Sequence, residues 1–218
     1  MRSDQDDDGF GLPELTQALN PQTDVSRETC DRLTAFVALL RKWNATHNLI
    51  GPAEAGRLWR RHVLDSAQIE THVPPRAKTW VDFGSGGGFP VAVIACLRPD
   101  RRYIAIESAG KKAAFLRHVA RELGLMFHVK HARIEAVDPE MCDIVSARAL
   151  APLPKLLEWG APWLSSCGQA LFLKGSGVDM ELTNAQQSWS FRASRHPSLT
   201  GDGVTLSIRD LCRKDAES

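Results

Sequence analysis

A glycine-rich run and a distant carboxylate are the residues of this sequence best suited to hold a ligand. Residues 81–90 read VDFGSGGGFP and stand between a strand-like segment at 79–83 and a helical segment at 91–97. Glycines leave backbone N–H groups uncovered, so a ligand can approach this turn closely. Glu107 ends the next strand-like segment, where its carboxylate can accept hydrogen bonds from both hydroxyls of a ribose. Together they predict a site for a nucleoside-containing cofactor.

The spacing of the glycines separates this loop from two common phosphate-binding loops. The dinucleotide fingerprint G-x-G-x-x-G fails, because in either register an apolar residue stands where the third glycine is required. The lysine that a triphosphate-binding P-loop needs after its last glycine is also missing. Asp82, Gly84 and Gly86 follow the pattern D-x-G-x-G-x-G, which resembles the nucleoside-binding loop of class I methyltransferases. The alternative is a tight turn without a ligand, with Glu107 a solvated strand end.

The elements that must position this loop alternate between strand and helix, which predicts an α/β fold with a mostly parallel, Rossmann-like sheet. Strand-like segments are expected at 79–83, 102–106, 128–131, 143–146 and 169–174, with helices between them. Two further strands, at 192–195 and 204–210, are joined by Gly-Asp-Gly and predict an antiparallel pair at the sheet edge.

Two amphipathic helical stretches, at 23–43 and 53–71, precede the alternating part. We therefore divide the chain into an acidic, disordered tail at 1–22, an N-terminal helical part at 23–75, and a domain at 76–218, which the resemblance of its glycine loop implies to be an S-adenosylmethionine-binding methyltransferase domain.

Composition limits the classes of protein to which the chain can belong. Of its 218 residues 43% are hydrophobic, which is enough for a substantial core. The acidic first residues are the reverse of a secretion signal, and no apolar run approaches the roughly 18 residues of a membrane span. We expect a cytoplasmic protein without membrane contact. The five cysteines are far apart and lack the spacing of zinc ligands, so we expect reduced, mostly buried thiols and no metal.

Six phrases of the sequence, spread over about residues 26–210, resemble in order the signature phrases of the RsmG (GidB) family. They are RKWN at 41–44 with NL at 48–49, RHVLDS at 61–66, DFGSG at 82–86, KK at 111–112 with FLR at 115–117, SARA at 146–149, and LKG at 173–175. The resemblance implies transfer of a methyl group from S-adenosylmethionine to N7 of a guanine in a loop of 16S ribosomal RNA.

The resemblance also implies which residues line the cofactor pocket. They are Gly84, Phe89, Ile134, Glu135 and Arg148, with Glu107 on the ribose. Ile134 and Glu135 follow the third expected strand, where an apolar side chain can flank an adenine and polar groups can meet its edge. Arg148 follows the fourth strand, at the edge where open α/β sheets bind ligands. Core packing of Ile134 and an ion pair of Arg148 within the fold are the alternatives.

Methylation of N7 needs alignment and exclusion of water more than a general base, because the N7 lone pair carries no proton. We therefore assign no catalytic residue. The phrase SARA at 146–149 stands where amino-directed methyltransferases carry Asp/Asn-Pro-Pro-Tyr, and the sequence has no Pro-Cys nucleophile of pyrimidine C5 enzymes. N7 and ribose targets remain, and the family resemblance selects N7.

An RNA target has to present an exposed or flipped-out base, because the major groove of A-form RNA is too narrow for side chains. Such a site needs a basic rim, although charged runs are more often solvated faces. The candidates are Arg57, Arg60, Arg61, His62, Lys111, Lys112, Arg117 and Lys174. Asn44 and Asn48, four residues apart on one helical face, could bind RNA or cap the neighbouring loop. For His62 a structural role is the alternative.

The expected partner is 16S ribosomal RNA, as part of the small ribosomal subunit or of an assembly intermediate, and we expect the protein to be a monomer. Two other functions remain open at the level of sequence. One is an RNA-binding or ribosome assembly factor that keeps only the methyltransferase fold. The other is a methyltransferase for another substrate.

Overall fold

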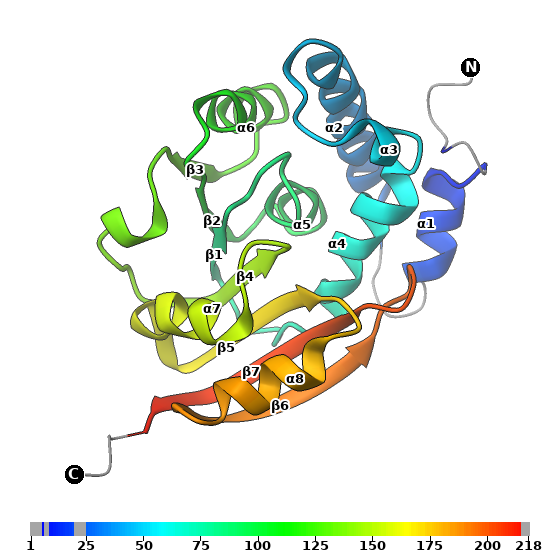
Figure 1. The fold of residues 1–218 in the computed structure, drawn as a ribbon. Helices are drawn as coiled ribbons and strands as arrows, with labels where there is room; N and C mark the ends of the chain where they lie inside the picture. Colours follow the sequence, from blue (N-terminus) through cyan, green and yellow to red (C-terminus); the bar gives the residue numbers. More distant parts are fainter. Residues whose placement is uncertain (1–5, 7–8, 20–24, 215–218) are drawn as a thin grey trace.

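The computed structural model describes residues 6, 9–19 and 25–214, and a seven-stranded mixed sheet lies at its centre (Figure 1). The strands are β1 (Thr79–Phe83), β2 (Arg102–Ile106), β3 (Phe127–Lys130), β4 (Cys142–Arg148), β5 (Leu164–Lys174), β6 (Trp189–Pro197) and β7 (Val204–Arg213). Their order across the sheet is β3-β2-β1-β4-β5-β7-β6. The first five are parallel to one another, whereas β7 runs antiparallel to β5 and to β6. The predicted sheet and its antiparallel edge are confirmed.

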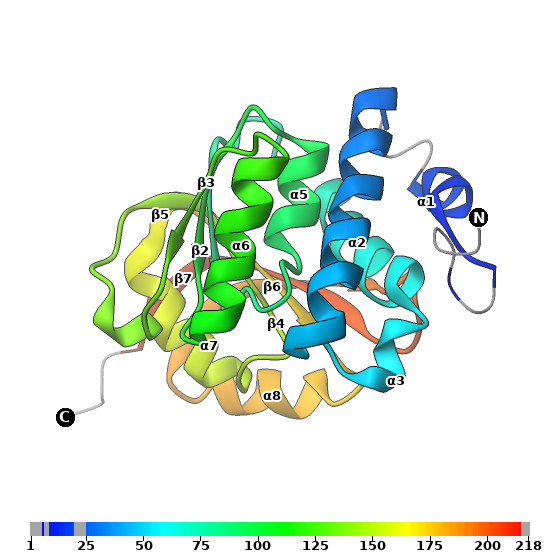
Figure 2. The ribbon, with the colours of Figure 1, turned by 90° about the horizontal axis from the view of Figure 1, so that it is seen from above.

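Helices cover both faces of the sheet. They are α1 (Leu12–Leu19), α2 (Arg27–His47), α3 (Pro52–Ala55), α4 (Asp65–Ala67), α5 (Val91–Leu97), α6 (Gly110–Glu122), α7 (Leu153–Gly160) and α8 (Val178–Ala185), with a π-helix η1 (Leu58–Leu64) and 3-10 turns η2 (Gln68–His72), η3 (Ile134–Ala136) and η4 (Ala161–Trp163). Seen from above, α2, α5 and α6 lie side by side on one face (Figure 2). Helices α7 and α8 pack together on the other.

Alternation along the central strands builds two separate cores. Trp80 and Ile144 point into the cluster that contains α2, α5 and α6. Their neighbours Val81 and Val145 point into the cluster that contains α7 and α8. Because both faces of the central strands are buried, the strands read as nearly continuous apolar runs.

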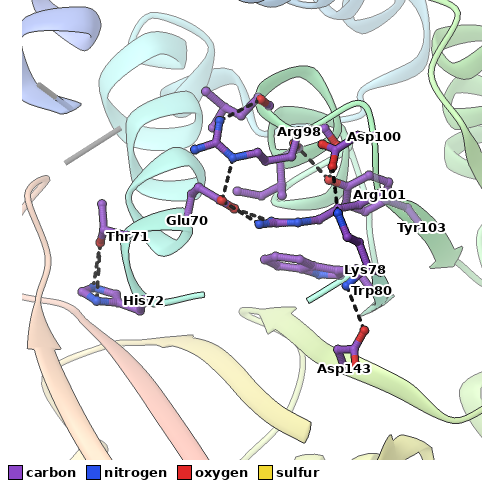
Figure 3. A network of polar contacts seen from close by, with 12 residues as sticks. Glu70, Thr71, His72, Lys78, Trp80, Arg98, Asp100, Arg101, Tyr103 and Asp143 are labelled. Carbon is purple, nitrogen blue, oxygen red and sulfur yellow. Dashed lines mark hydrogen bonds and ion pairs between the residues drawn. The ribbon is translucent and has the colours of Figure 1, made fainter. Parts of the chain in front are cut away.

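A buried ion pair joins the N-terminal helical part to the sheet (Figure 3). Glu70 lies in η2, and its side chain is 4% exposed. It accepts hydrogen bonds from Arg101 Nη1 at 2.6 Å, Arg101 Nη2 at 2.9 Å and Arg98 Nε at 2.9 Å. A buried carboxylate is tolerable only with such partners, so these contacts hold η2 against the loop between α5 and β2.

The structure differs from the predicted disordered tail at residue 6 and over residues 9–19. Leu15 and Leu19 are fully buried on one face of α1, a spacing that the sequence already contained. The buried Asp6 accepts hydrogen bonds from the backbone N–H groups of Trp59 at 2.9 Å and Arg60 at 2.8 Å, at the start of the π-helix. The remainder of that tail lies outside the described residues, and the division of the chain at residue 76 stays a prediction.

Several element boundaries also differ from expectation. Helix α2 begins four residues later than expected because Ser26 accepts a hydrogen bond from Thr29 N and caps it. The stretch 53–71 is divided among α3, η1, α4 and η2 instead of forming one α-helix. All five cysteines are free, but only Cys96 and Cys142 are buried, so the expectation of mostly buried thiols is wrong. Among the helices of the described residues, none has both the length and the apolar character to cross a bilayer.

Candidate functional site

The glycine loop leaves the carboxyl end of β1 in a conformation that depends on glycine. Gly84 has φ +63° and Gly86 has φ +54°, in the left-handed region that other residues rarely adopt. The N–H groups of Gly84 and Ser85 both donate to the carbonyl of Ile106, at 2.8 and 3.2 Å. These bonds fasten the loop to the end of the neighbouring strand β2.

Glu107 contacts the same loop directly. Its buried carboxylate accepts a hydrogen bond from Gly86 N at 2.8 Å and another from Ala109 N at 2.7 Å, one on each oxygen. Each carboxylate oxygen has a further lone pair, so both remain able to accept a bond from a ribose hydroxyl. The loop and the carboxylate that the sequence paired therefore lie in contact.

Asp82 supports the loop from beneath. It is fully buried, and its carboxylate accepts a hydrogen bond at 2.6 Å from Ser146 Oγ on β4. Trp80 Nε1 donates to the same hydroxyl at 2.7 Å. Burial raises the pKa of Asp82 to about 7, because the charged form is poorly solvated there. The contacts of Asp82 connect β1 to β4, and no local pattern indicated Ser146 as its partner.

Arg148 closes β4 and joins the sheet edge to the π-helix. Its guanidinium lies over the ring of Phe89, 5.0 Å from the centroid, and donates to Arg61 O at 3.2 Å and Asp65 Oδ2 at 3.4 Å. It also donates to Nδ1 of His62, whose ring stacks on Phe89 with centroids 4.8 Å apart. The ion pair within the fold, the alternative weighed for Arg148, is thus present.

His62 is buried in this cluster and is not part of an exposed rim. Burial and the nearby Arg148 lower its pKa to about 3, so the ring is neutral at ordinary pH. A neutral ring accepts the hydrogen bond from Arg148 without repulsion. The sequence placed His62 among exposed RNA contacts, and the structure corrects this because tertiary packing covers the ring.

Ile134 and Glu135 lie in η3, after β3. Ile134 is half-buried against the core beneath α7, and Glu135 is exposed. Because parallel strands end at the same edge, this turn, Glu107, the glycine loop and Arg148 follow one another in that order along the edge of the sheet. Phe89 is buried beneath Arg148 and against Phe36 instead of facing an open pocket.

A cavity of about 490 Å³ opens beside Arg148, at the carboxyl ends of β4 and β5. Its wall includes Asp65, Lys174, Ser198 and Thr200. Ser198 Oγ and Thr200 Oγ1 donate to Asp65 Oδ1 at 3.2 and 3.1 Å, which fastens the loop between β6 and β7 to α4. The volume lies within the range of small-molecule sites. Sequence reasoning missed Ser198 and Thr200, since nothing local marks a contact with a residue about 130 positions away.

The candidate RNA contacts are differently exposed. Arg57, Arg60, Arg61, Lys111 and Arg117 are exposed, and Lys112 is half-exposed. Lys174 is largely covered, and its ammonium lies 2.6 Å from Glu181 Oε2. Asn44 Oδ1 accepts a hydrogen bond from Ile50 N at 2.9 Å, so it caps the loop that follows α2. Asn48 ends that helix with φ +49° and is exposed.

Solved structures share this fold at low identity. A ribosomal protein L11 methylase from Lactobacillus delbrueckii subsp. bulgaricus matches with TM-score 0.54 and 17% identity, over 71% of this chain and 79% of its own. A SAM-dependent methyltransferase from Aquifex aeolicus matches with TM-score 0.56 and 12% identity, over 79% and 97%. Such identities establish the fold alone. The fold is that of the class I methyltransferases.

The sequence comparisons identify the family within this fold. The GidB family model, described as rRNA small subunit methyltransferase G, matches residues 29–206. Proteins named ribosomal RNA small subunit methyltransferase G from Cereibacter sphaeroides and Parvibaculum lavamentivorans are 45% and 46% identical. These alignments cover 90% and 93% of this chain and 98% and 92% of the relatives. The chain belongs to the GidB family, as its signature phrases indicated.

Proposed function

We propose that this chain transfers the methyl group of S-adenosylmethionine to N7 of a guanine in a loop of 16S ribosomal RNA. One observation carries the proposal beyond family membership. Arg148 stands between the glycine loop edge and the 490 Å³ cavity, and lines the latter. A methyl donor bound along the loop edge and a base bound in the cavity would therefore meet at the end of β4, and transfer between two bound groups requires such proximity.

The residues along the edge fit a nucleoside donor. Glu107 holds the loop through Gly86 and Ala109 and keeps acceptor capacity for the ribose hydroxyls. Gly84 lets the backbone approach the ligand, and Ile134 would flank the adenine, with Glu135 at its edge. Phe89 acts through the guanidinium and the imidazole that pack on its ring.

When bound, S-adenosylmethionine supplies an electrophilic methyl on a sulfonium. The N7 lone pair would form the new C–N bond with that methyl group, the electrons of the broken C–S bond would stay on sulfur, and no proton would leave. The chain's residues therefore need to bind and orient the base and exclude water. The neutral His62 orients Arg148 and accepts no proton from the substrate.

We also propose that the substrate is 16S RNA in the small subunit or in an assembly intermediate, and that the protein acts as a monomer in the cytoplasm. The exposed Arg61 of the π-helix supports an RNA partner, because it lines the cavity, and its neighbour Arg60 adds a second exposed positive charge on the same helix. Lys111 and Lys112 stand at the start of α6, four and five residues after Glu107.

Mapping of methylated guanines in 16S RNA from cells with and without this protein tests the proposal. We expect one N7-methylguanosine that depends on the protein and is cut by borohydride followed by aniline. A methyl group on an exocyclic amine, C5 or ribose hydroxyl would contradict the N7 assignment. RNA binding without any methyl transfer by purified protein would favour an assembly factor.

A further inference from the structure

A second cavity, of about 420 Å³, lies away from the cofactor edge, over the middle of β5, β7 and β6. Two arginines, two histidines, a glutamine and three hydroxyl side chains line it, and neither a carboxylate nor an apolar side chain is among them. The charged members are Arg192 on β6 and Arg209 on β7. Such a lining suits an anion and offers nothing to an apolar partner.

The cavity exists because helices cover only one face of this part of the sheet. Leu206 and Ile208 of β7 are buried against the α7 and α8 cluster. The alternate residues Ser207 and Arg209 therefore point to the opposite face. That face is covered only in part, by His72 at the end of η2, which Figure 3 shows beside these strands and apart from the Glu70 cluster.

The positions of the two arginines bring like charges together, and packing does not explain this electrostatic repulsion. Arg192 and Arg209 are directly opposite each other in the antiparallel register, an arrangement in which like charges repel. Arg192 pairs with Asp210, and the Arg209 guanidinium donates to Gln169 Oε1 at 2.8 Å. Within residues 25–214, no ion pair to a carboxylate is found for Arg209. One carboxylate thus accompanies two guanidinium groups and contacts only that of Arg192, which leaves positive charge for a ligand.

A neutral donor, His72, completes the site. His72 and His196 stack face to face with ring centroids 3.7 Å apart. Burial and the neighbouring His196 lower the pKa of His72 to about 4, so its ring is neutral at ordinary pH and offers an N–H donor. The buried Gln169 donates to Ser207 Oγ at 2.6 Å and to His72 O at 3.2 Å, which holds the floor in place. Among the described side chains no group of three metal-ligating residues exists, so a metal has no cage here.

One chain segment connects this cavity to the cavity beside Arg148. Arg192, Ser194 and His196 of β6 line the second cavity, and Ser198 and Thr200, just beyond the strand, line the first. From residue 198 back to 192 an extended chain spans about 20 Å. A single RNA strand with its base in the first cavity can therefore reach the second with the phosphates of neighbouring nucleotides.

We propose that this surface, lined by Arg192, Arg209, His72 and His196, binds backbone phosphates of the RNA strand that flanks the target base. The inference rests on the proposed function, since it assigns the path of that same substrate. Phosphate contacts of this kind position RNA without reading its sequence.

The test compares the double variant Arg192→Gln/Arg209→Gln with Arg195→Gln. Arg195 stands on the same strand, has the same charge and is exposed, but it pairs at 2.5 Å with Asp179 of α8 on the opposite face. Affinity for a single-stranded 16S fragment that contains the target loop is measured from 50 to 200 mM salt. The logarithm of the affinity falls linearly with the logarithm of the salt concentration, and the loss of two phosphate contacts should reduce this slope by about 1.4. Wild type should therefore lose about sevenfold more affinity over this range than the double variant. Arg195→Gln should match wild type.

Three controls make the result specific. Arg192→Lys/Arg209→Lys keeps both charges and should restore most of the slope. S-adenosylhomocysteine affinity and the unfolding midpoint of the double variant should equal those of wild type, which shows that the fold persists. Inorganic phosphate should compete only weakly; saturable phosphate binding with an unchanged RNA slope would assign the cavity to a free anion and overturn the proposal.

An unchanged slope in the double variant, or an equal loss in Arg195→Gln, would also overturn it. Methyl transfer by the wild-type protein to the same RNA is measured alongside. If transfer is absent while the slope still falls in the double variant, the proposed function fails and the phosphate surface stands.

Discussion

Replacing Glu70 with glutamine should destabilise the protein strongly, because the carboxylate is the counter-charge of a buried guanidinium. Glu70 and Arg101 have side chains only 4% and 6% exposed, and the pair is bidentate. Removing one partner of a buried ion pair leaves the other charge unsolvated, which lowers the free energy of unfolding by about 3–5 kcal/mol. For a chain of this length that loss lowers the unfolding midpoint by roughly 6–20 °C.

Urea unfolding of wild type and Glu70→Gln measures the difference in free energy. Asp100→Asn is the matched control, because it removes an adjacent carboxylate whose pair with Lys78 is exposed at both ends (Figure 3). An exposed pair contributes about 0–1 kcal/mol, so this variant should remain near wild type. If Glu70→Gln costs no more than Asp100→Asn, the view that Glu70 joins the helical part to the sheet is refuted.

Three further predictions concern the site and the rim. Gly84→Val forces a branched residue into φ +63° and should weaken S-adenosylhomocysteine binding at least tenfold, about 1.4 kcal/mol, as measured by calorimetry. In the same assay NAD should not bind wild type. Near-normal affinity of the variant for S-adenosylhomocysteine would mean that the cofactor site lies elsewhere. His62 is held neutral by a folded-state pKa of about 3, below its unfolded 6.5, so its contribution to stability is complete above pH 6.5 and declines as the pH falls toward 3. The free-energy gap between wild type and His62→Leu should therefore narrow on acidification, and a gap that widens contradicts this. Arg60→Gln/Arg61→Gln should reduce the slope of log RNA affinity against log salt concentration by roughly 0.7 per lost contact and leave cofactor affinity unchanged. An unchanged slope would mean that both residues belong to a solvated face without RNA contacts.

Local patterns in the sequence predicted the parts of the molecule that depend on short-range rules. Glycine spacing, the strand before it and the carboxylate after the next strand predicted that the loop and Glu107 form one unit, and Gly86 N does contact that carboxylate. The alternation of strand and helix predicted the parallel sheet and its antiparallel edge, because each depends on periodicity within a single element. The spacing of the leucines in α1 already contained its apolar face, although the acidic residues before it are typical of a disordered tail.

Tertiary structure decided which side chains are covered and which meet. The sequence could not show that His62 is buried beneath Arg148, because a histidine beside two arginines has the same local pattern on a rim or in a core. Nor could it place Asp6 on the π-helix, since nothing short-range links residues more than 50 positions apart. The pairing of Arg192 with Arg209 depends on the register of β6 against β7, and a shift of one residue would turn one of the two arginines to the face that α8 covers. Burial and register are properties of the whole chain, so only the folded structure determines them.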